Sequence, residues 1–289
     1  MHTTLIEPAE LAAHLGASDW AIVDCRFDLA DPAWGERTFR TSHIPGALYA
    51  HLDEDLSGPR TAHSGRHPLP SAEALAALFG RLGIDAGVQV IAYDQGSGAF
   101  AARLWWLLRW LGHPAVALLN GGFAAWQRAA LPLESAQQVR APRRFAGAPA
   151  ARMLAGGAEI AAALASGALR GGRTALVDAR AADRFRGENE TLDPVAGHIP
   201  GARNHPFAAN LDAAGRWLSA AELRRAWQQT LRDTPAAAAV AMCGSGVTAC
   251  HNLLALEIAG LPGARLYAGS WSEWIRDPQH AVARGSETA

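Results

Sequence analysis

A cysteine stands in a glycine-rich stretch late in the chain, "MCGSGVTAC" at residues 242–250. The apolar run "AAAAVA" precedes this stretch, and the helical pattern "HNLLALEIAG" follows it after Cys250. Cys243 is therefore expected at the carboxyl end of a strand, in the turn that leads into a helix. Catalytic groups of α/β proteins occupy such positions. A cysteine there acts as a nucleophile when it is a thiolate.

The loop itself offers surroundings that suit an anion. Its backbone N–H groups and the N-terminus of the following helix, expected to begin at Val247, stabilise negative charge. Its two glycines let the backbone close around the sulfur, and its two hydroxyl side chains can donate hydrogen bonds. Ser245 is expected to be catalytic, and the residues expected to bind the substrate around Cys243 are Gly244, Gly246, Val247 and Thr248.

The chain contains three cysteines, an odd number that does not indicate a disulfide framework. A free cysteine is more often a small buried apolar residue, which is the alternative interpretation of Cys243 and the expected role of Cys25. A disulfide to Cys250 is not expected, because two residues seven apart across a helix start are up to ~10 Å apart.

An internal repeat organises the whole chain. "AIVDCR" returns as "ALVDAR", "SHIPGA" as "GHIPGA", and "VIAYDQGSG" as "VAMCGSG". In this alignment Asp94 stands in the first copy where Cys243 stands in the second. The first copy is therefore expected to be catalytically inactive.

Each copy alternates short apolar strands with helical patterns, which predicts an α/β fold with a mainly parallel sheet flanked by helices. The predicted organisation is an N-terminal domain over residues 1–138, a linker and lead-in over 139–165, and a catalytic C-terminal domain over 166–289. Parallel strands place their carboxyl ends at one edge of a sheet. The active site is therefore expected at the edge where the Cys243 loop lies.

Composition narrows the class of protein. All 26 basic residues are arginine and the net charge is −1, so a basic nucleic-acid surface is not expected. No apolar run approaches the ~18 residues of a membrane span, and the first residues do not resemble a secretory signal, so a soluble cytoplasmic protein is expected. Neither a metal site nor a cofactor is expected, since no Cys and His pairs stand at ligand spacing.

The combination of a repeated "VDxR" and "HIPGA", a cysteine loop after a strand, and "YAGSWSEW" resembles the two-domain rhodanese superfamily. The loop "CGSGVTAC" is most similar to that of 3-mercaptopyruvate sulfurtransferases. This resemblance implies that Cys243 takes sulfur from a small-molecule donor as a persulfide, releasing pyruvate when the donor is 3-mercaptopyruvate. Cyanide, a small thiol or a reduced thioredoxin-like protein would then accept the sulfur.

The resemblance also implies further site residues. Arg184 matches the first of two family arginines that bind the donor carboxylate, whereas "ENETLDPVAGH" contains no arginine to match the second. Arg186 is a candidate replacement. Asp55 and His67 match the first two members of a serine-protease-like trio that Ser245 completes. Such a histidine can move a proton to or from a hydroxyl or a thiol.

Three other functions remain open at this stage. A thiosulfate sulfurtransferase would benefit from cations beside the sulfur to hold a dianion, and Gly244 and Ser245 provide none, which favours 3-mercaptopyruvate. A related cysteine phosphatase or arsenate reductase needs an arginine six positions after the cysteine, where the chain has Ala249. A non-catalytic regulatory module is the third alternative, since Asp94 shows that this fold can lose its nucleophile.

Overall fold

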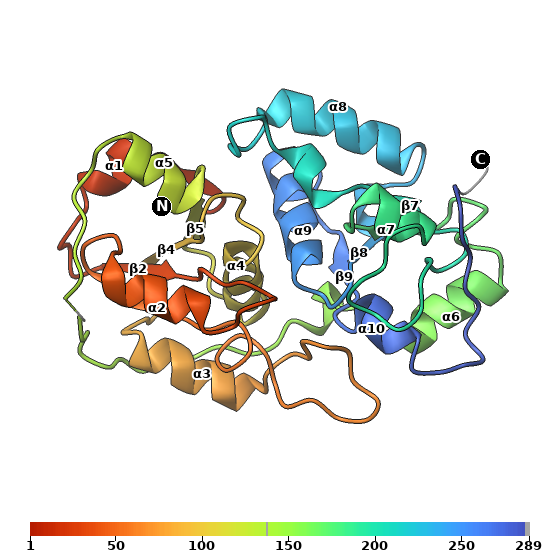
Figure 1. Ribbon diagram of the computed structural model, residues 1–289, viewed down its shortest axis with the longest axis horizontal. Coiled ribbons are helices and arrows are strands. Elements are labelled where there is room, and N and C mark those ends of the chain that lie inside the picture. The colour runs from red at the N-terminus through yellow and green to blue at the C-terminus, as the bar shows by residue number, and fades with distance from the viewer. Residues whose placement is uncertain (137, 287–289) are drawn as a thin grey trace. The chain divides into compact units, whose positions relative to one another are not determined.

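The computed structural model describes residues 1–136 and 138–286 and forms two compact units (Figure 1). The first unit consists of Met1–Gly58, Leu69–Ala150 and Ala213–Trp217, and the second of Pro59–Pro68, Ala151–Asp212 and the chain from Leu218 onward. The segment Pro59–Pro68, called the 59–68 segment below, therefore belongs to the second unit although its sequence lies in the first copy. The domain boundaries at residues 138 and 166 stay predictions.

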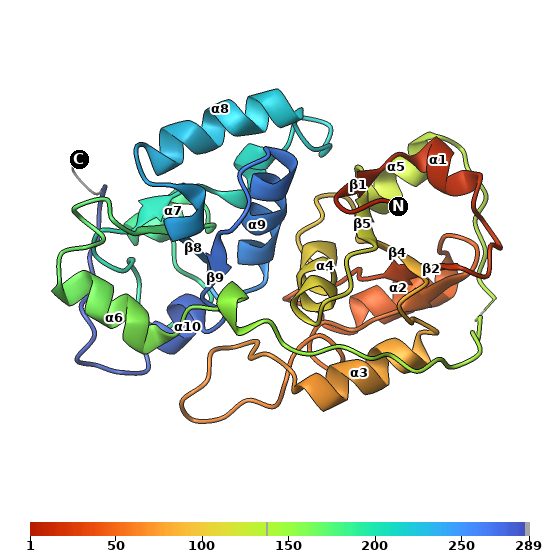
Figure 2. The same cartoon turned by 180° about the vertical axis from the view of Figure 1, so that it is seen from behind.

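The first unit contains a five-stranded parallel sheet with the strand order β1-β5-β4-β2-β3. Its strands are β1 (Leu5–Ile6), β2 (Trp20–Asp24), β3 (Ala47–Tyr49), β4 (Gln89–Tyr93) and β5 (Val116–Leu119). Its helices are α1 (Pro8–Ala12), α2 (Trp34–Thr41), α3 (Ala72–Arg81), α4 (Ala101–Trp110) and α5 (Gly122–Arg128). Helix α4 packs on β4 and β5, which is visible from behind in Figure 2.

The second unit repeats this plan with a four-stranded parallel sheet in the order β7-β6-β8-β9. Its strands are β6 (Ala175–Asp178), β7 (Arg203–Asn204), β8 (Ala239–Met242) and β9 (Arg265–Leu266). Its helices are α6 (Gly157–Ala165), α7 (Ala182–Arg186), α8 (Ala220–Leu231), α9 (Thr248–Ile258) and α10 (Ser270–Trp274), with 3-10 turns at Ala151–Met153, Phe207–Asn210 and Ala236–Ala238. Both sheets confirm the predicted α/β class with parallel strands.

The strands of both units are buried on both faces, as their continuous apolar sequences indicate. Helices α6, α7 and α10 cover one face of the second sheet and share a core cluster with strand residues such as Val240. Helices α1, α2 and α5 do the same in the first unit. Trp126 in α5 and Trp274 in α10 are buried at matching places, so the repeat extends from the sequence to the packing of the core.

A buried ion pair recurs at the end of the first long strand of each unit. Arg26 donates to both carboxylate oxygens of Asp24, and Arg180 does the same to Asp178. Each guanidinium also donates to a backbone carbonyl just before the repeated histidine, Ser42 O at 2.7 Å and Gly197 O at 2.8 Å. The arginine of each "VDxR" motif therefore links the end of its strand to the "HIPGA" turn. Removing one partner of such a buried ion pair costs about 3–5 kcal/mol.

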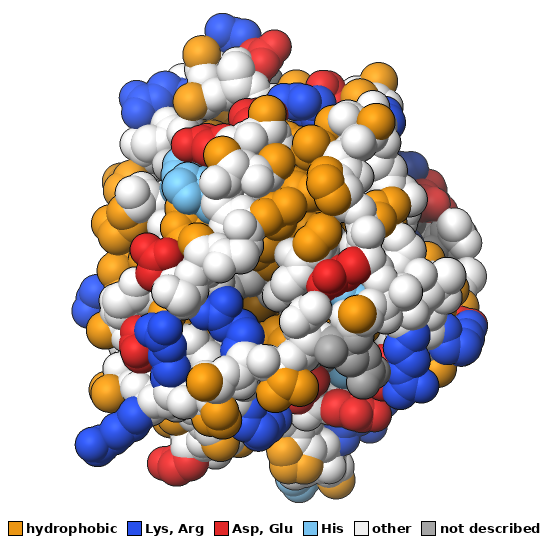
Figure 3. All heavy atoms as spheres, turned by 90° about the vertical axis from the view of Figure 1, so that its left-hand side faces the viewer, with side chains coloured by type: hydrophobic (Ala, Val, Ile, Leu, Met, Phe, Trp, Pro, Cys, Tyr) orange, Lys and Arg blue, Asp and Glu red, His pale blue; other side chains and the backbone are white. Residues whose placement is uncertain are grey.

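Charged side chains of both signs are interspersed on the face of the molecule shown in Figure 3, with no large patch of arginine alone. Over the described residues, no helix has the length and apolar character that crossing a membrane requires. The surface in this view therefore matches the balanced composition of the chain.

Candidate active site

Cys243 directly follows β8, an interior strand of the second sheet, and lies at the carboxyl end of that strand. Its Sγ accepts hydrogen bonds from the backbone N–H groups of Ser245, at 3.4 Å, and Gly246, at 3.1 Å. The residue is 2% exposed. Amide N–H groups that point at a sulfur in a largely dry site stabilise negative charge on it. The loop thus has the geometry that a nucleophilic cysteine requires.

The start of α10 fixes the backbone of the cysteine loop. Ser270 Oγ accepts from the N–H of Cys243 at 3.0 Å. The N–H groups of Trp271 and Ser272 donate to the carbonyls of Cys243 and Gly244, at 3.0 and 2.9 Å. These bonds hold the loop backbone against the start of α10, while the N–H groups of Ser245 and Gly246 donate to the sulfur.

The rest of the loop turns the chain into α9. Gly246 has a left-handed φ of +77°, and a Cβ on it would lie 2.3 Å from the carbonyl oxygen of Ala268, so only glycine fits. Val247 is buried and precedes the helix, which begins at Thr248 and not at Val247 as the sequence suggested. The helix N-terminus still starts within five residues of Cys243, as an anion-stabilising loop requires.

Ser245 and His67 are brought together in the second unit. Ser245 Oγ and His67 Nδ1 form a hydrogen bond of 2.7 Å, and the two residues are 6% and 2% exposed. His67 reaches this position because the 59–68 segment packs in the second unit. The pairing links a histidine to a residue whose N–H contacts the cysteine sulfur, so a proton can be moved close to the nucleophile.

Asp55 lies in the first unit. Its carboxylate accepts from the backbone N–H of His51 at 2.9 Å and lies 3.5 Å from the guanidinium of Arg81. Burial raises the pKa of this carboxyl, while the His51 bond and the charge of Arg81 act in the opposite direction. Its predicted role beside His67 stays a prediction.

Arg184 lies next to the cysteine loop, held by two buried carboxylates. Its Nε and Nη2 donate to Glu190 at 2.8–3.2 Å, and Nη2 lies 3.4 Å from Asp193 Oδ2. Burial alone would raise the pKa of Glu190, but the Arg184 hydrogen bonds and backbone donors hold it below its usual value. A Cβ on Gly244 would lie 3.8 Å from Arg184 Nη2, which places this guanidinium beside the nucleophile.

Arg66 also lies beside this loop, a residue that the sequence analysis did not single out. Its Nη1 donates to Asp193 Oδ1, and its Nη2 lies 3.0 Å from the position that a Cβ on Gly244 would take. Its backbone N–H donates to Ser272 Oγ at 2.9 Å. Gly244 and Ser245 themselves carry no cation, as the sequence shows, but two guanidinium groups, those of Arg66 and Arg184, reach Gly244 from elsewhere in the sequence.

Comparison with protein families agrees with this architecture. The rhodanese-like domain family matches two stretches of the chain, residues 7–129 and 161–277. The chain belongs to the rhodanese family. The two matches confirm that the internal repeat is a pair of rhodanese domains, as the motifs predicted.

Relatives of this rhodanese chain are named as sulfurtransferases. A Pseudomonas aeruginosa protein named as a probable 3-mercaptopyruvate sulfurtransferase is 50% identical over 97% of this chain and 98% of its own length. The thiosulfate sulfurtransferase of Gallus gallus is 34% identical over 84% of this chain and 83% of its own length. The structure of the Leishmania major 3-mercaptopyruvate sulfurtransferase superposes with a TM-score of 0.82 at 32% identity, covering 94% of this chain and 74% of that one. These matches confirm the predicted enzyme class.

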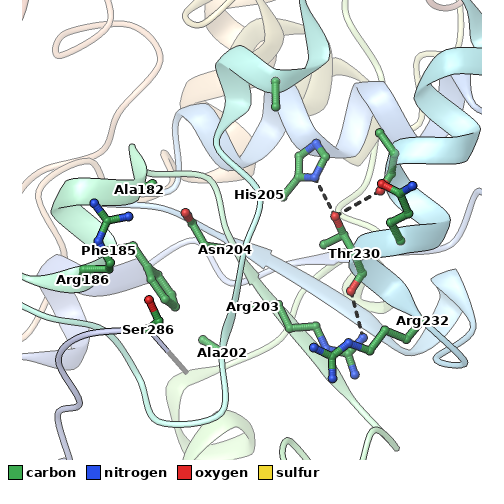
Figure 4. Close-up of a pocket in the computed structure, with 13 residues that line it drawn as sticks. Ala182, Phe185, Arg186, Ala202, Arg203, Asn204, His205, Thr230, Arg232 and Ser286 are labelled. Carbon is green, nitrogen blue, oxygen red and sulfur yellow. Dashed lines mark hydrogen bonds between the residues drawn. The ribbon is translucent and has the colours of Figure 1, made fainter. Parts of the chain in front are cut away.

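Arg186, the candidate for the second family arginine, lies elsewhere in this rhodanese domain. It forms a bidentate ion pair with Glu188 and lines a pocket of about 580 Å³ between α7, β7 and α8 (Figure 4). Arg203 and Arg232 line the same pocket. Among the described residues that line it, none belongs to the loop 243–248. The predicted role of Arg186 in binding the donor stays a prediction.

The other two cysteines, Cys25 and Cys250, are buried and form no disulfide. Burial raises the pKa of Cys25 well above its usual value, and nearby carboxylates raise it further, so this thiol stays protonated. Cys250 Sγ contacts the carbonyl of Gly246 at 3.4 Å from within α9. Across residues 1–136 and 138–286, no cluster of three His, Cys, Asp or Glu side chains suits a metal ion.

Proposed function

We propose that this rhodanese enzyme transfers sulfur from 3-mercaptopyruvate to a thiophilic acceptor through a persulfide on Cys243. The observation that carries the proposal is the pair of N–H groups that Ser245 and Gly246 direct at the cysteine sulfur. The first relative in the comparison, at 50% identity over nearly its whole length, is named for the same donor.

The reaction divides into two steps that balance. The Cys243 thiolate attacks the sulfur of the donor, the carbon–sulfur bond breaks, and its electron pair leaves with the carbon as the enolate of pyruvate. The enolate takes up one proton, and the donor sulfur remains on Cys243 as a persulfide. In the second step the acceptor attacks the outer sulfur, so cyanide leaves as thiocyanate, and the Cys243 thiolate is restored.

Ser245 and His67 supply the proton transfer in this proposal. The donor thiol must lose a proton for its sulfur to end as a persulfide anion, and the leaving enolate must gain one. A buried histidine at 2.7 Å from a serine hydroxyl can move a proton between these two positions. Asp55 would orient the histidine, as the family resemblance implies.

The charges around Gly244 support a monocarboxylate donor. The guanidinium groups of Arg66 and Arg184 are offset by the carboxylates of Glu190 and Asp193. The cluster therefore offers directional donors without net positive charge. A monoanion is satisfied by directional hydrogen bonds, whereas the dianion thiosulfate gains more from net positive charge close to its sulfur.

Parallel kinetics on one preparation test this choice of donor. We expect kcat/KM for 3-mercaptopyruvate to exceed that for thiosulfate by at least about 10-fold, a difference of ~1.4 kcal/mol in transition-state binding. Cys243→Ser provides the blank for both donors. A kcat/KM with thiosulfate that equals or exceeds that with 3-mercaptopyruvate would contradict the proposal.

Thiosulfate sulfurtransferase is the second candidate, favoured by the two guanidinium groups beside Gly244. The acceptor is proposed to be cyanide, a small thiol or a thioredoxin-like protein. We place the enzyme in the cytoplasm, because three cysteines that form no disulfide suit a reducing compartment. The regulatory-module alternative predicts no turnover with either donor.

A further inference from the structure

The pocket of about 580 Å³ shown in Figure 4 lies beside β7, the edge strand of the second sheet. Its lining comes from α7, β7, α8 and the 3-10 turn at Phe207–Asn210, with Ser286 at its rim. A volume of this size accommodates a small organic molecule. Over the described part of the chain, the lining includes neither Cys243 nor Arg66 and Arg184. The pocket is therefore separate from the cysteine loop.

Two arginines at one end of the pocket have no acidic partner. Arg203 donates only to neutral acceptors, the carbonyls of Thr230 and Leu231 and, at 3.1 Å, Thr234 Oγ1. The side chain of Arg232 is exposed and forms no hydrogen bond or ion pair with the residues that the structure describes. Burial lowers the pKa of Arg203, and the charge of Arg232 lowers it further. Two positive charges therefore lie close together without a carboxylate to balance them (Figure 4).

The backbone at Arg232 does not account for the presence of an arginine there. Arg232 directly follows the last residue of α8 and has a φ of +52°. Glycine is the usual residue at positive φ after a helix, and other side chains are strained there. Strained residues of this kind concentrate at ligand-binding sites. The position of Arg232 is thus consistent with a role for its charge in the pocket.

The first unit has no such set of polar residues at the corresponding edge strand. The register of the two sheets and the sequence repeat align three residues that line the pocket with three of the first unit, so that Arg203, Asn204 and His205 correspond to Leu48, Tyr49 and Ala50. The ring of Tyr49 packs against Phe39, with the centroids 5.5 Å apart. Asn204 is smaller than a tyrosine and leaves this space open. The fold itself therefore does not require the polar lining.

The other end of the pocket offers an acceptor and small apolar side chains. Asn204 Nδ2 donates to the carbonyls of Asp178 and Arg180, at 3.0 and 2.9 Å, so its Oδ1 is directed into the pocket (Figure 4). The apolar part of the lining consists mainly of alanines, Ala182, Ala202, Ala209 and Ala226. A ligand that carries a hydroxyl group at this end can donate to Asn204 Oδ1.

We propose that this pocket binds a small phosphomonoester, with the phosphate between Arg203 and Arg232 and the hydroxyl-bearing organic part toward Asn204. A phosphomonoester carries ~1.5–2 negative charges near neutral pH, which matches two arginines without a counter-charge. Guanidinium groups bind phosphate oxygens with directional, charge-assisted hydrogen bonds. The site is a second ligand site of the enzyme, and it binds its ligand whether or not Cys243 transfers sulfur.

Isothermal titration calorimetry with glycerol 3-phosphate, at low salt and about pH 8, tests the site. The protein is titrated before and after Cys243 is blocked with iodoacetamide, and both forms should bind one equivalent with the same affinity. Arg232→Gln should weaken binding roughly 10-fold, because one charge-assisted contact is lost. Arg225→Gln, on an exposed part of the same helix, is the control and should bind as wild type. No binding, or equal binding in Arg232→Gln and wild type, would overturn the proposal.

Two further titrants test the chemical class of the ligand. Inorganic phosphate should bind roughly 3-fold more weakly than glycerol 3-phosphate, because it lacks the hydroxyl groups that reach Asn204. Malonate, a dicarboxylate of similar charge, should bind more weakly than either. If malonate bound as tightly as glycerol 3-phosphate, the assignment to phosphate would be wrong.

Protection from phenylglyoxal, which modifies exposed guanidinium groups, locates the bound ligand. Glycerol 3-phosphate should slow the modification of Arg232 roughly 10-fold at a saturating concentration, as followed by peptide mass spectrometry, and should leave that of Arg225 unchanged. Equal rates at Arg232 with and without the ligand would place the phosphate elsewhere and overturn the proposal.

Discussion

The loop that follows β4 and the loop that follows β8 occupy the same place in the two rhodanese domains but enclose different groups. In the first, the carboxylate of Asp94 accepts from four backbone N–H groups, those of Gly96, Gly98, Phe100 and Ala101, at 2.9–3.3 Å. In the second, the sulfur of Cys243 accepts from two. Both loops therefore direct backbone N–H groups at an acceptor. In the first loop this acceptor is the carboxylate of the chain's own Asp94, and in the second it is the sulfur of Cys243.

The lengths of the loops differ as well. Helix α4 begins seven residues after Asp94, whereas α9 begins five residues after Cys243. The shorter loop wraps a single sulfur atom, and the longer loop wraps both oxygens of a carboxylate. The fold thus conserves a nest of N–H groups, while catalysis requires a nucleophile in the nest and partners such as His67 that only the second unit receives.

The largest effect is expected when the loop after β8 receives the carboxylate that the loop after β4 carries at Asp94. Cys243→Asp should abolish sulfur transfer, with a loss of roughly 1,000-fold or more, because no nucleophilic sulfur remains to form the persulfide. The variant should stay folded, since the loop N–H groups can bond the new carboxylate, and circular dichroism checks this. Cys25→Ala is the control and should keep its activity. Substantial transfer by Cys243→Asp would mean that the wrong loop has been assigned.

Removal of the histidine that distinguishes the second site should have the next largest effect. His67→Gln should lower kcat by roughly 100- to 10,000-fold, because the Ser245 hydroxyl loses the group with which it exchanges a proton. His63→Gln, on the exposed part of the same 59–68 segment, is the matched control for steady-state assays. If both variants kept full kcat, the Ser245–His67 pair would have no part in the chemistry.

The first loop should affect stability and not chemistry. Asp94→Ala leaves four backbone N–H groups without their acceptor, two of them on the buried residues Gly98 and Ala101, which should lower the free energy of unfolding by about 3 kcal/mol in urea titrations. The kcat of the folded protein should change by less than about 2-fold. A variant of normal stability with strongly reduced kcat would contradict the division of roles between the two loops.

A smaller effect of pH is expected in both units. Burial lowers the pKa of His113 in the first unit and of His205 in the second below the ordinary value of 6.5. Below pH 6.5 the unfolded chain therefore binds more protons than the folded one, so the free energy of unfolding should fall as the pH drops from 7 to 5. His205→Asn should reduce this dependence in urea titrations at several pH values. A stability that rises on acidification over this range would refute the assignment.

The sequence was sufficient to predict the elements that repeat. Apolar strands ending in Asp24 and Asp178, the two "HIPGA" turns and the loop around Cys243 are local patterns, and each of them stands in the structure where its spacing indicated. The family resemblance also paired Ser245 with His67, which lie within hydrogen-bonding distance.

The cation cluster could not be predicted in this way. The one sequence feature that could have indicated Arg66 as a site residue is its position next to His67 in "SGRHPLP". Its contact with Asp193 depends on how the 59–68 segment folds back onto a distant part of the chain. Arg186 was a reasonable candidate by spacing, yet α7 directs it to Glu188. Sequence distance says little about side chains that meet through tertiary packing.

The central claim is that Cys243 carries the transferred sulfur, and intact-mass spectrometry tests it most directly. The protein is mixed with 3-mercaptopyruvate in the absence of an acceptor, and the released pyruvate is measured in parallel. Wild type should gain the mass of one sulfur atom on the peptide that contains Cys243, lose it on addition of cyanide, and release one pyruvate per chain, while Cys243→Ser should gain nothing. A sulfur adduct on Cys25 or Cys250, or an adduct that persists in Cys243→Ser, would contradict the account.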